Sequence, residues 1–180
     1  MPLQSQTRYR CAGPVPGAAP RIQTNVRALA PRIAVMDPIT IVPIGRVVCD
    51  ERDPARVDWS RVRSEVRLDA DLEGALLGLA DYSHVIVVGW LDQYPEALRA
   101  RRQAYPSGDD RYPLQGALAL RGARPNPIAV TVCKLRGIDG ATLRVEGLDL
   151  VDGTPILDVK PYIAHYDAEP KASIPRWARG

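Results

Sequence analysis

The apolar runs of this sequence are short, rich in β-branched residues and separated by glycine and proline, which restricts the chain to a fold built from strands. Six runs have the pattern of strands: residues 41–48, 62–68, 85–90, 128–135, 143–146 and 156–160. Residues 71–79 instead show helical spacing, with leucines on one side and a candidate N-cap at Asp69 or Asp71. Many short strands without alternating long helices predict an all-β fold, a single closed or nearly closed β-barrel with short helices.

Length and composition predict one domain with tails. The 180 residues are 46% apolar and 25% charged, which is enough to bury a core without a metal or disulfides. No apolar run reaches the roughly 18 residues that a membrane helix needs, so we expect no membrane span. Cys11, Cys49 and Cys133 are an odd number without close spacing, which favours a reducing compartment, the cytoplasm. The apolar neighbours of Cys133 favour a packed strand residue over a nucleophile.

The positive charge is concentrated at the N-terminus. Residues 1–38 hold five arginines and one acid, which leaves 19 basic and 20 acidic residues in the rest of the chain. That segment is also rich in proline, alanine and glycine, so residues 1–38 are predicted to be a disordered or dispensable extension. Because the remainder is near neutral, attraction to a nucleic-acid backbone has to come from a local patch.

One candidate for such a patch is a basic cluster in a polar segment. It consists of Arg99, Arg101, Arg102 and Arg111. These side chains can neutralise RNA phosphates and release condensed counterions. An ordinary solvated surface is an equal alternative.

A first unusual run of polar and cyclic residues is Arg124-Pro125-Asn126-Pro127-Ile128. Each proline fixes its own φ and pushes the preceding residue into the extended region. The Asn126 side chain is therefore held in one direction, beside a guanidinium that can bind anions.

A second run extends over residues 148–163 and contains the turn Asp152-Gly153-Thr154-Pro155. Aspartate begins the turn, glycine accepts a positive φ and proline restarts an extended chain. Strand alternation after the turn predicts Ile156, Asp158 and Lys160 on one face, with Leu157 and Val159 on the other.

Familiar cofactor motifs are missing from the sequence. It has no Gly-rich loop between a strand and a helix, which argues against a Rossmann-type site. It also has no P-loop, no HExxH motif and no Cys/His cluster, so we expect no metal.

The two runs, at this separation, resemble the TsaA-like (TrmO, formerly YaeB) family of S-adenosylmethionine-dependent methyltransferases. Members of this family carry a segment like ATRSPxRPNPIG followed by one like DLLDGTPVLDIKPYIP. Residues 41–47 and 79–88 resemble the family's opening IGxI strand and its LEEFSHLWVL strand. The resemblance predicts a TsaA-like barrel domain over residues 39–168 and a C-terminal tail over residues 169–180.

The resemblance implies S-adenosylmethionine as the cofactor, bound at or near the interface of a homodimer. In it, Val130 packs on the adenine, and residues 146–149 offer backbone groups and an acid to the amino and hydroxyl groups. The implied cofactor-binding residues are Ser83, His84, Arg121, Val130, Glu146, Gly147, Leu148 and Asp149. Outside the resemblance, His84 would more often be a structural histidine and Arg121 a solvated arginine.

The family methylates the exocyclic nitrogen of a threonylcarbamoylated adenosine beside the anticodon of a tRNA. This reaction needs in-line alignment of donor and acceptor and removal of one proton. Candidate substrate-binding residues are Arg124, Asn126 and Lys160, and candidate bases by residue type alone are Asp158 and Tyr162. No catalytic residue is assigned. The alternative is a hydrogen-bonded scaffold, formed by the same residues, that holds the two runs together.

The sequence also departs from the family's pattern. Residues 119–124 replace ATRSPxR and lose the Thr and Ser hydroxyls and one residue of loop, Ala129 stands where the family prefers glycine, and Asp92 falls where many members have histidine. Cofactor binding is therefore better supported than the tRNA substrate. Two alternatives stay open: a methyltransferase acting on another RNA or a small molecule, and a non-catalytic barrel that binds S-adenosylmethionine or RNA.

Overall fold

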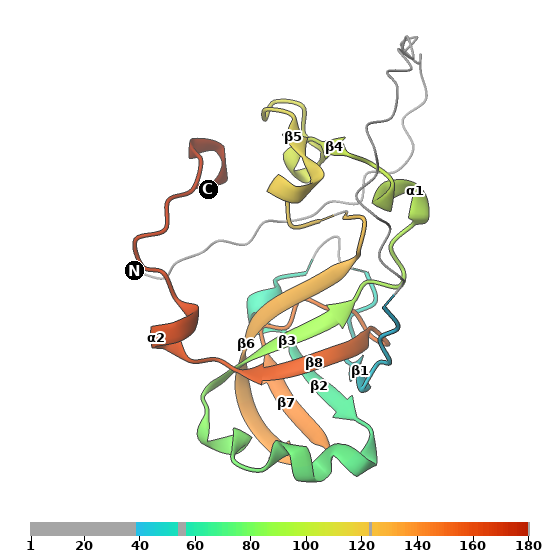
Figure 1. The fold of residues 1–180 in the computed structure, drawn as a ribbon, viewed down its shortest axis with the longest axis vertical. Helices are drawn as coiled ribbons and strands as arrows, with labels where there is room; N and C mark the ends of the chain where they lie inside the picture. Colours follow the sequence, from blue (N-terminus) through green and yellow to red (C-terminus); the bar gives the residue numbers. More distant parts are fainter. Residues whose placement is uncertain (1–38, 54–56, 123, 180) are drawn as a thin grey trace.

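Six antiparallel strands form a closed barrel in the computed structural model, which describes residues 39–53, 57–122 and 124–179. The strand order is β1-β2-β7-β6-β3-β8, and β8 pairs again with β1 (Figure 1). The strands are β1 (Gly45–Val48), β2 (Arg63–Leu68), β3 (His84–Trp90), β6 (Ile128–Asp139), β7 (Thr142–Glu146) and β8 (Pro155–Pro161). The predicted closed β-barrel is confirmed. The predicted extension over residues 1–38, including Cys11, lies outside the described residues.

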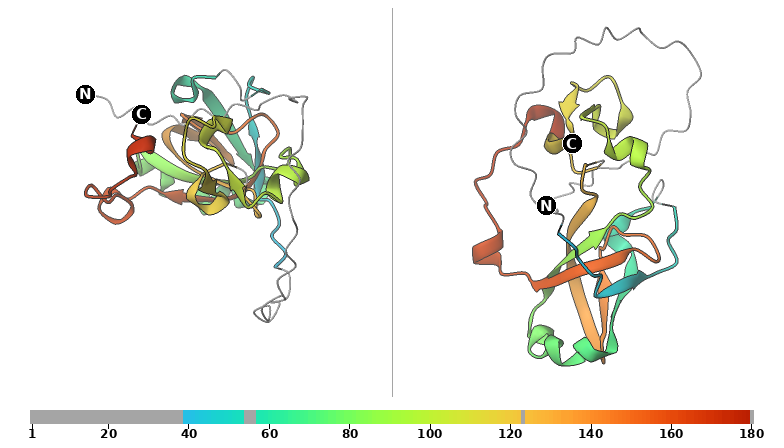
Figure 2. Two further views of the ribbon diagram at one scale, coloured as in Figure 1. Left: turned by 90° about the horizontal axis from the view of Figure 1, so that it is seen from above. Right: turned by 45° about the vertical axis from the view of Figure 1, so that its right-hand side comes forward.

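The chain between β3 and β6 forms a small lobe beyond one end of the barrel (Figures 1 and 2). It contains α1 (Glu96–Arg99) and a two-stranded sheet of β4 (Gln103–Ala104) and β5 (Gln115–Gly116). The other helix, α2 (Ala164–Asp167), follows β8, and the remaining helical turns are 3-10 helices at Trp59–Arg61, Ala70–Leu76, Leu79–Asp81, Pro106–Gly108, Ala117–Ala119 and Arg176–Ala178. Within the described ranges, no helix has the length and apolar character to cross a membrane.

The helix predicted over residues 71–79 is wrong in type. The structure has two 3-10 helices there, Ala70–Leu76 and Leu79–Asp81, and Asp69 precedes the first without a side-chain capping bond. Gly78 separates them with φ +81°, a left-handed conformation that ends one helix and cannot continue it. Leu76 is still buried, so the leucine spacing identified the face that packs on the core.

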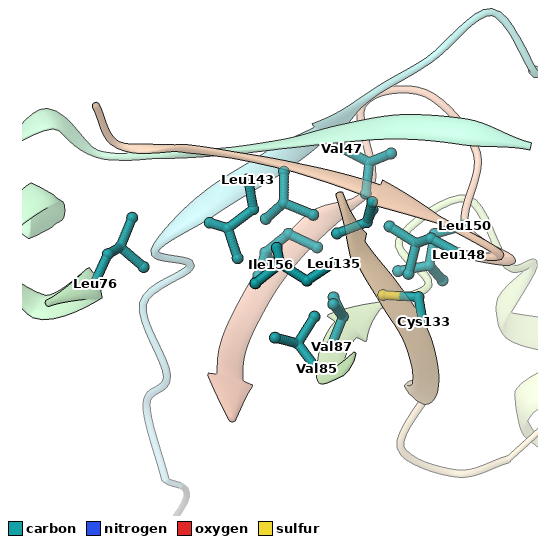
Figure 3. Packing of buried hydrophobic residues seen from close by; sticks show 12 residues of the cluster. Val47, Leu76, Val85, Val87, Cys133, Leu135, Leu143, Leu148, Leu150 and Ile156 are labelled. Carbon is teal, nitrogen blue, oxygen red and sulfur yellow. The ribbon is translucent and has the colours of Figure 1, made fainter. Parts of the chain in front are cut away.

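The core fills the barrel with aliphatic side chains from alternate positions of every strand (Figure 3). Val47, Val66, Val87 and Leu143 are fully buried. Cys133 lies among them and is 2% exposed, and this burial raises the pKa of its thiol to about 12. A packed strand residue is therefore confirmed for Cys133, because the nucleophilic form of cysteine is the thiolate.

The predicted alternation along β8 is wrong because the strand contains an irregularity. Pairing with β3 shifts register between Val88 and Gly89, so Gly89 opposes Ile156 whereas Val88 opposes Asp158. Ile156 therefore points into the core with Val159, and Asp158 and Lys160 lie on the outside. A bulge places two residues against one on the partner strand and reverses the side-chain order beyond it. The consequence is that both charged side chains of β8 face the outer surface.

Candidate functional site

An apolar strip covers the outer face of the first half of β6. Ile128, Val130 and Val132 alternate with inward-facing residues and are 36%, 47% and 48% exposed. On the neighbouring strand β3, Val88 lies opposite Val130 and Ile86 opposite Val132. Exposed aliphatic side chains in one row of a rigid sheet offer a flat surface for an aromatic ring or for another protein surface.

The segment after β7 runs beside this strip and closes one end of the barrel. Gly147 turns the chain with φ +89°, and Leu148 and Leu150 are then buried to 0% and 1% exposure (Figure 3). Asp149, between the two leucines, is left exposed beside β6. Because its neighbours are anchored in the core on both sides, the carboxylate has a fixed position.

Two side-chain hydrogen bonds link this part of β6 to its surroundings. The Thr131 hydroxyl donates to the Asp149 carboxylate. On the backbone, the carbonyl of Val130 accepts a hydrogen bond of 2.7 Å from the Arg121 guanidinium. Arg121, Val130 and Asp149, which the resemblance implied would share a site, are thus brought together.

A polar row borders the strip further along β6. The strand registers align Glu146 with Lys134 and Lys134 with His84, all on the outer surface. The Ser83 hydroxyl and Nδ1 of His84 are hydrogen-bonded at 2.8 Å. The Tyr162 ring meets the His84 ring edge-on, with centroids 6.3 Å apart. This row holds an acid, an amine and an imidazole within three adjacent strands.

The Glu146 carboxylate is held in place by two arginines. Arg136 lies 2.7 Å from it and Arg63 lies 3.5 Å away. Hydrogen bonding from Arg136, assisted by Arg63, lowers the pKa of Glu146, so this carboxyl is an anion and a hydrogen-bond acceptor at neutral pH. The Leu148 side chain, in contrast, is fully buried, so only its backbone is available to a ligand.

The candidate substrate-binding residues fall into two groups. The Arg124 guanidinium donates to the Leu120 carbonyl at 2.9 Å, and Asn126 is exposed on the turn that leads into β6. On the outside of β8, Lys160 and Asp158 form an ion pair of 2.5 Å, and the hydrogen bond that the Lys160 amine donates to Asp158 raises the pKa of this amine. In the described part of the chain, no hydrogen bond joins one group to the other, so the scaffold that would hold the two runs together is not formed through these side chains.

The basic cluster of the β3–β6 lobe is divided among internal partners. The Arg99 guanidinium lies 5.9 Å from the centre of the Trp90 ring, in the range of a cation–π contact. Arg111 forms an ion pair with Asp109 at 2.5 Å, and Arg102 donates to the carbonyl of Ala100. Within the described ranges, only Arg101 of this cluster is exposed and makes no side-chain hydrogen bond or ion pair.

The structure shows the surroundings of the residues that depart from the family pattern. Ala129 points toward the core directly opposite Gly89, so its methyl group lies beside a residue that has no side chain. In the altered loop, Arg121 and Arg124 both donate to backbone carbonyls. Asp92 is exposed at the end of β3.

Sequence reasoning missed Lys134 and Thr131. The registers of β6 place Lys134 between Glu146 and His84 on the outer surface. Thr131 faces inward opposite Val87 and reaches Asp149 by its hydroxyl, and only its position within the same strand run could have indicated this contact. Among the residues that the structure describes, no group of three or more His, Cys, Asp or Glu side chains is arranged to hold a metal ion.

Comparison with known proteins finds relatives that are described as S-adenosyl-L-methionine-binding proteins or tRNA methyltransferases. A probable S-adenosyl-L-methionine-binding protein of Archaeoglobus fulgidus is 37% identical over 125 residues, which are 67% of this chain and 32% of that protein. A tRNA (adenine(37)-N6)-methyltransferase of Mus musculus is 32% identical over 132 residues, 68% of this chain and 29% of the relative. The chain thus spans about a third of the length of these two relatives.

A solved structure and a family model agree with these relatives. The crystal structure of TrmO from Pseudomonas aeruginosa superposes with a TM-score of 0.63 and 27% identity, covering 81% of this chain and 64% of that one. The family model described as the tRNA-methyltransferase O N-terminal domain matches residues 52–168. The TsaA-like resemblance of the sequence is confirmed, and the chain belongs to the tRNA-methyltransferase O N-terminal domain family.

Proposed function

We propose that this chain is an S-adenosylmethionine-dependent methyltransferase that acts on the N6 atom of a tRNA adenine. The observation that carries the proposal is the strip of Val130 and Val132, bordered by Arg121 and by the row of Glu146 and His84. Asp149, hydrogen-bonded to the inward-facing Thr131, lies beside the same part of β6. An apolar surface with a few fixed polar groups at its edges is the usual construction of a cofactor site. The family membership and the relatives' names support the same assignment.

Each border residue has a role that follows from its chemistry. Val130 offers its exposed methyl groups to the adenine face of the cofactor. Asp149 and Glu146 accept hydrogen bonds from amino and hydroxyl groups, and the Arg121 guanidinium donates to an anionic or carbonyl oxygen. S-adenosylmethionine supplies a methyl group already activated on a sulfonium. The protein therefore has to orient the acceptor nitrogen and take its proton.

The acceptor side of the site lies across β3 from the strip. Asp158 and Lys160 face outward there, opposite Val88 and Ile86 respectively. Since adjacent strands are about 4.8 Å apart, these charges lie on the order of 10 Å from the β6 strip, within reach of a bound nucleoside. We assign Lys160, with Arg124 and Asn126, to the acceptor. Within the family's chemistry, the proposed acceptor is a threonylcarbamoylated adenosine next to the anticodon, whose carboxylate would pair with Lys160.

The same strip also suggests how the site is completed. Ile128, Val130 and Val132 remain more than a third exposed in the single chain. We propose a homodimer in which a second copy approaches this strip and encloses the cofactor. We assign the proposed activity to residues 39–168 and, because the proposed acceptor is a tRNA, propose a cytoplasmic location.

Methyl transfer to bulk tRNA tests the proposed function. The protein, incubated with methyl-labelled S-adenosylmethionine, a chelator and tRNA, should produce labelled tRNA, and nucleoside mass spectrometry should find the methyl group on an adenosine derivative. Label in another nucleoside would indicate a different RNA substrate. Cofactor binding by calorimetry without transfer would indicate a non-catalytic barrel, and the lack of both binding and transfer would refute the proposal.

A further inference from the structure

Five arginines gather on the outside of the barrel, on the side formed by β1, β2, β7 and the second half of β6. Four of them line a depression of about 580 Å³ on this surface. We call this surface the arginine face: Arg46, Arg63, Arg67, Arg136 and Arg144. All five are exposed, and of these only Arg46 falls within a segment that the resemblance identified, residues 41–47.

Two of these arginines are placed where a protein fold alone would not favour them. The register of β1 against β2 puts Arg46 directly opposite Arg67. Like charges at directly opposed positions of neighbouring strands destabilise a sheet. An anion bound between the two guanidinium groups would reverse the sign of that interaction.

Three carboxylates hold four of the five guanidinium groups, Arg67 among them, without neutralising the face. Glu65 lies 2.8 Å from Arg67, and Asp139 lies 2.8 Å from Arg144. A third acid, Glu146, is shared by Arg136 and Arg63. A guanidinium has five N–H donors, and these contacts use only some of them. The ion pairs thus fix the orientation of the arginines while donors remain for a second ligand.

The arginine face adjoins the proposed cofactor site through β6. Register between β6 and β7 shifts between Leu135 and Gly137, which leaves Arg136 as the extra residue of a bulge. The bulge directs the Arg136 side chain to Glu146, which lies in the row with Lys134. Arg136 is four residues from Val132, which corresponds to about 13 Å along a strand. A chain-like ligand on the arginine face can therefore continue into the site.

We propose that the arginine face binds the ribose-phosphate backbone of the RNA acceptor and aligns it with the cofactor site. The inference rests on the proposed function for the identity of the RNA. A planar guanidinium group can bind two phosphate oxygens at once, and a rigid sheet fixes the distances between the guanidinium groups. The described domain has nearly balanced charge, so a local set of arginines is what such a partner requires.

Salt-dependent RNA binding tests this surface. The variant carrying Arg67→Gln and Arg144→Gln removes two exposed charges whose carboxylate partners lie outside the proposed cofactor site. Each lost phosphate contact reduces the slope of log K against log salt concentration by about 0.7–0.9, so we expect a reduction of about 1.4–1.8 for bulk tRNA. Affinity should fall at low salt and approach that of the unmodified protein at high salt. Calorimetry should show unchanged binding of S-adenosylmethionine.

Two control variants separate charge from fold and from location. Arg67→Lys with Arg144→Lys keeps both charges and should retain most of the salt slope. Arg176→Gln with Arg179→Gln removes the same net charge from the C-terminal segment and should leave the tRNA affinity unchanged. The proposal is overturned if the first double variant binds tRNA as tightly as the unmodified protein at every salt concentration, or if the C-terminal control loses as much affinity.

The same measurements distinguish this surface from the proposed function. Loss of the salt slope in a protein that does not bind S-adenosylmethionine would support the arginine face and refute the methyltransferase. Methyl transfer with an unchanged slope in the first double variant would support the methyltransferase and refute the arginine face.

Discussion

Replacing Asp149 by asparagine tests the cofactor site with the smallest change of shape. The exposed carboxylate is fixed between buried Leu148 and Leu150 and accepts a hydrogen bond from Thr131. A hydrogen bond to a charged group contributes about 1.5–3 kcal/mol. Since about 1.4 kcal/mol corresponds to a factor of ten, Asp149→Asn should weaken S-adenosylmethionine binding by about 10- to 150-fold. The unfolding free energy should change by less than about 0.5 kcal/mol, because the side chain is at the surface.

Isothermal calorimetry measures the affinity, and thermal unfolding of the ligand-free protein measures the stability. Thr131→Val should weaken binding less than Asp149→Asn, because it leaves the carboxylate present but unrestrained. The matched control is Asp139→Asn, which neutralises an exposed carboxylate at the far end of β6 and should leave cofactor affinity unchanged. Binding by Asp149→Asn within twofold of the unmodified protein would refute the reasoning, as would an equal loss in Asp139→Asn.

Three further predictions concern the barrel and its site. Gly45→Ala should lower the unfolding free energy by about 2–3 kcal/mol in a urea titration, because a Cβ atom would lie 2.3 Å from the Arg67 carbonyl oxygen. Gly74→Ala should not lower it, because there is open space around Gly74. Cys133, whose thiol has a pKa of about 12, carries almost no thiolate at pH 8, so alkylation mapped by mass spectrometry should modify it only after denaturation. Arg121→Ala should reduce cofactor affinity or methyl transfer by about tenfold, equal to roughly 1.4 kcal/mol, with little change in melting temperature. Wild-type behaviour in both assays would show that Arg121 has no role in the site.

The barrel was predictable because its strands carry their own hydrophobic signal. The runs at residues 62–68 and 143–146 match β2 and β7 closely, since each alternates apolar residues toward the core. The second half of β6 was missed because Arg136 and Asp139 are polar and Gly137 interrupts the pattern. Pairing with β7, a contact between different parts of the chain, keeps this segment extended. The prediction for β1 is wrong in the opposite direction, because residues 41–44 are apolar and were expected to be extended, and yet they form no strand.

The direction of individual side chains was less predictable than the strands themselves. A single register shift at Val88 and Gly89 turns Ile156 inward and leaves Asp158 outside, contrary to simple alternation. The shift coincides with crowding, because a Cβ on Gly89 would lie 2.8 Å from the Leu150 side chain. This constraint comes from the packing of Leu150, Thr154 and Pro155 against β3, which are contacts between distant parts of the chain, so no local rule could have revealed it.

The residues of the site needed two different kinds of information. Arg121 lies 9 residues before Val130 and Asp149 lies 19 residues after it, and the three carry no local signal of a common role, so only the family motifs connected them. The strand registers then explain why the motifs are spaced as they are. Arg121 and Asp149 contact adjacent residues of one strand, Val130 and Thr131, from different segments of the chain. One consequence is that a shift of β6 by a single residue would separate both contacts together and turn the apolar strip inward. The buried residues Cys133 and Leu135, which fix that register, therefore also fix the geometry of the site.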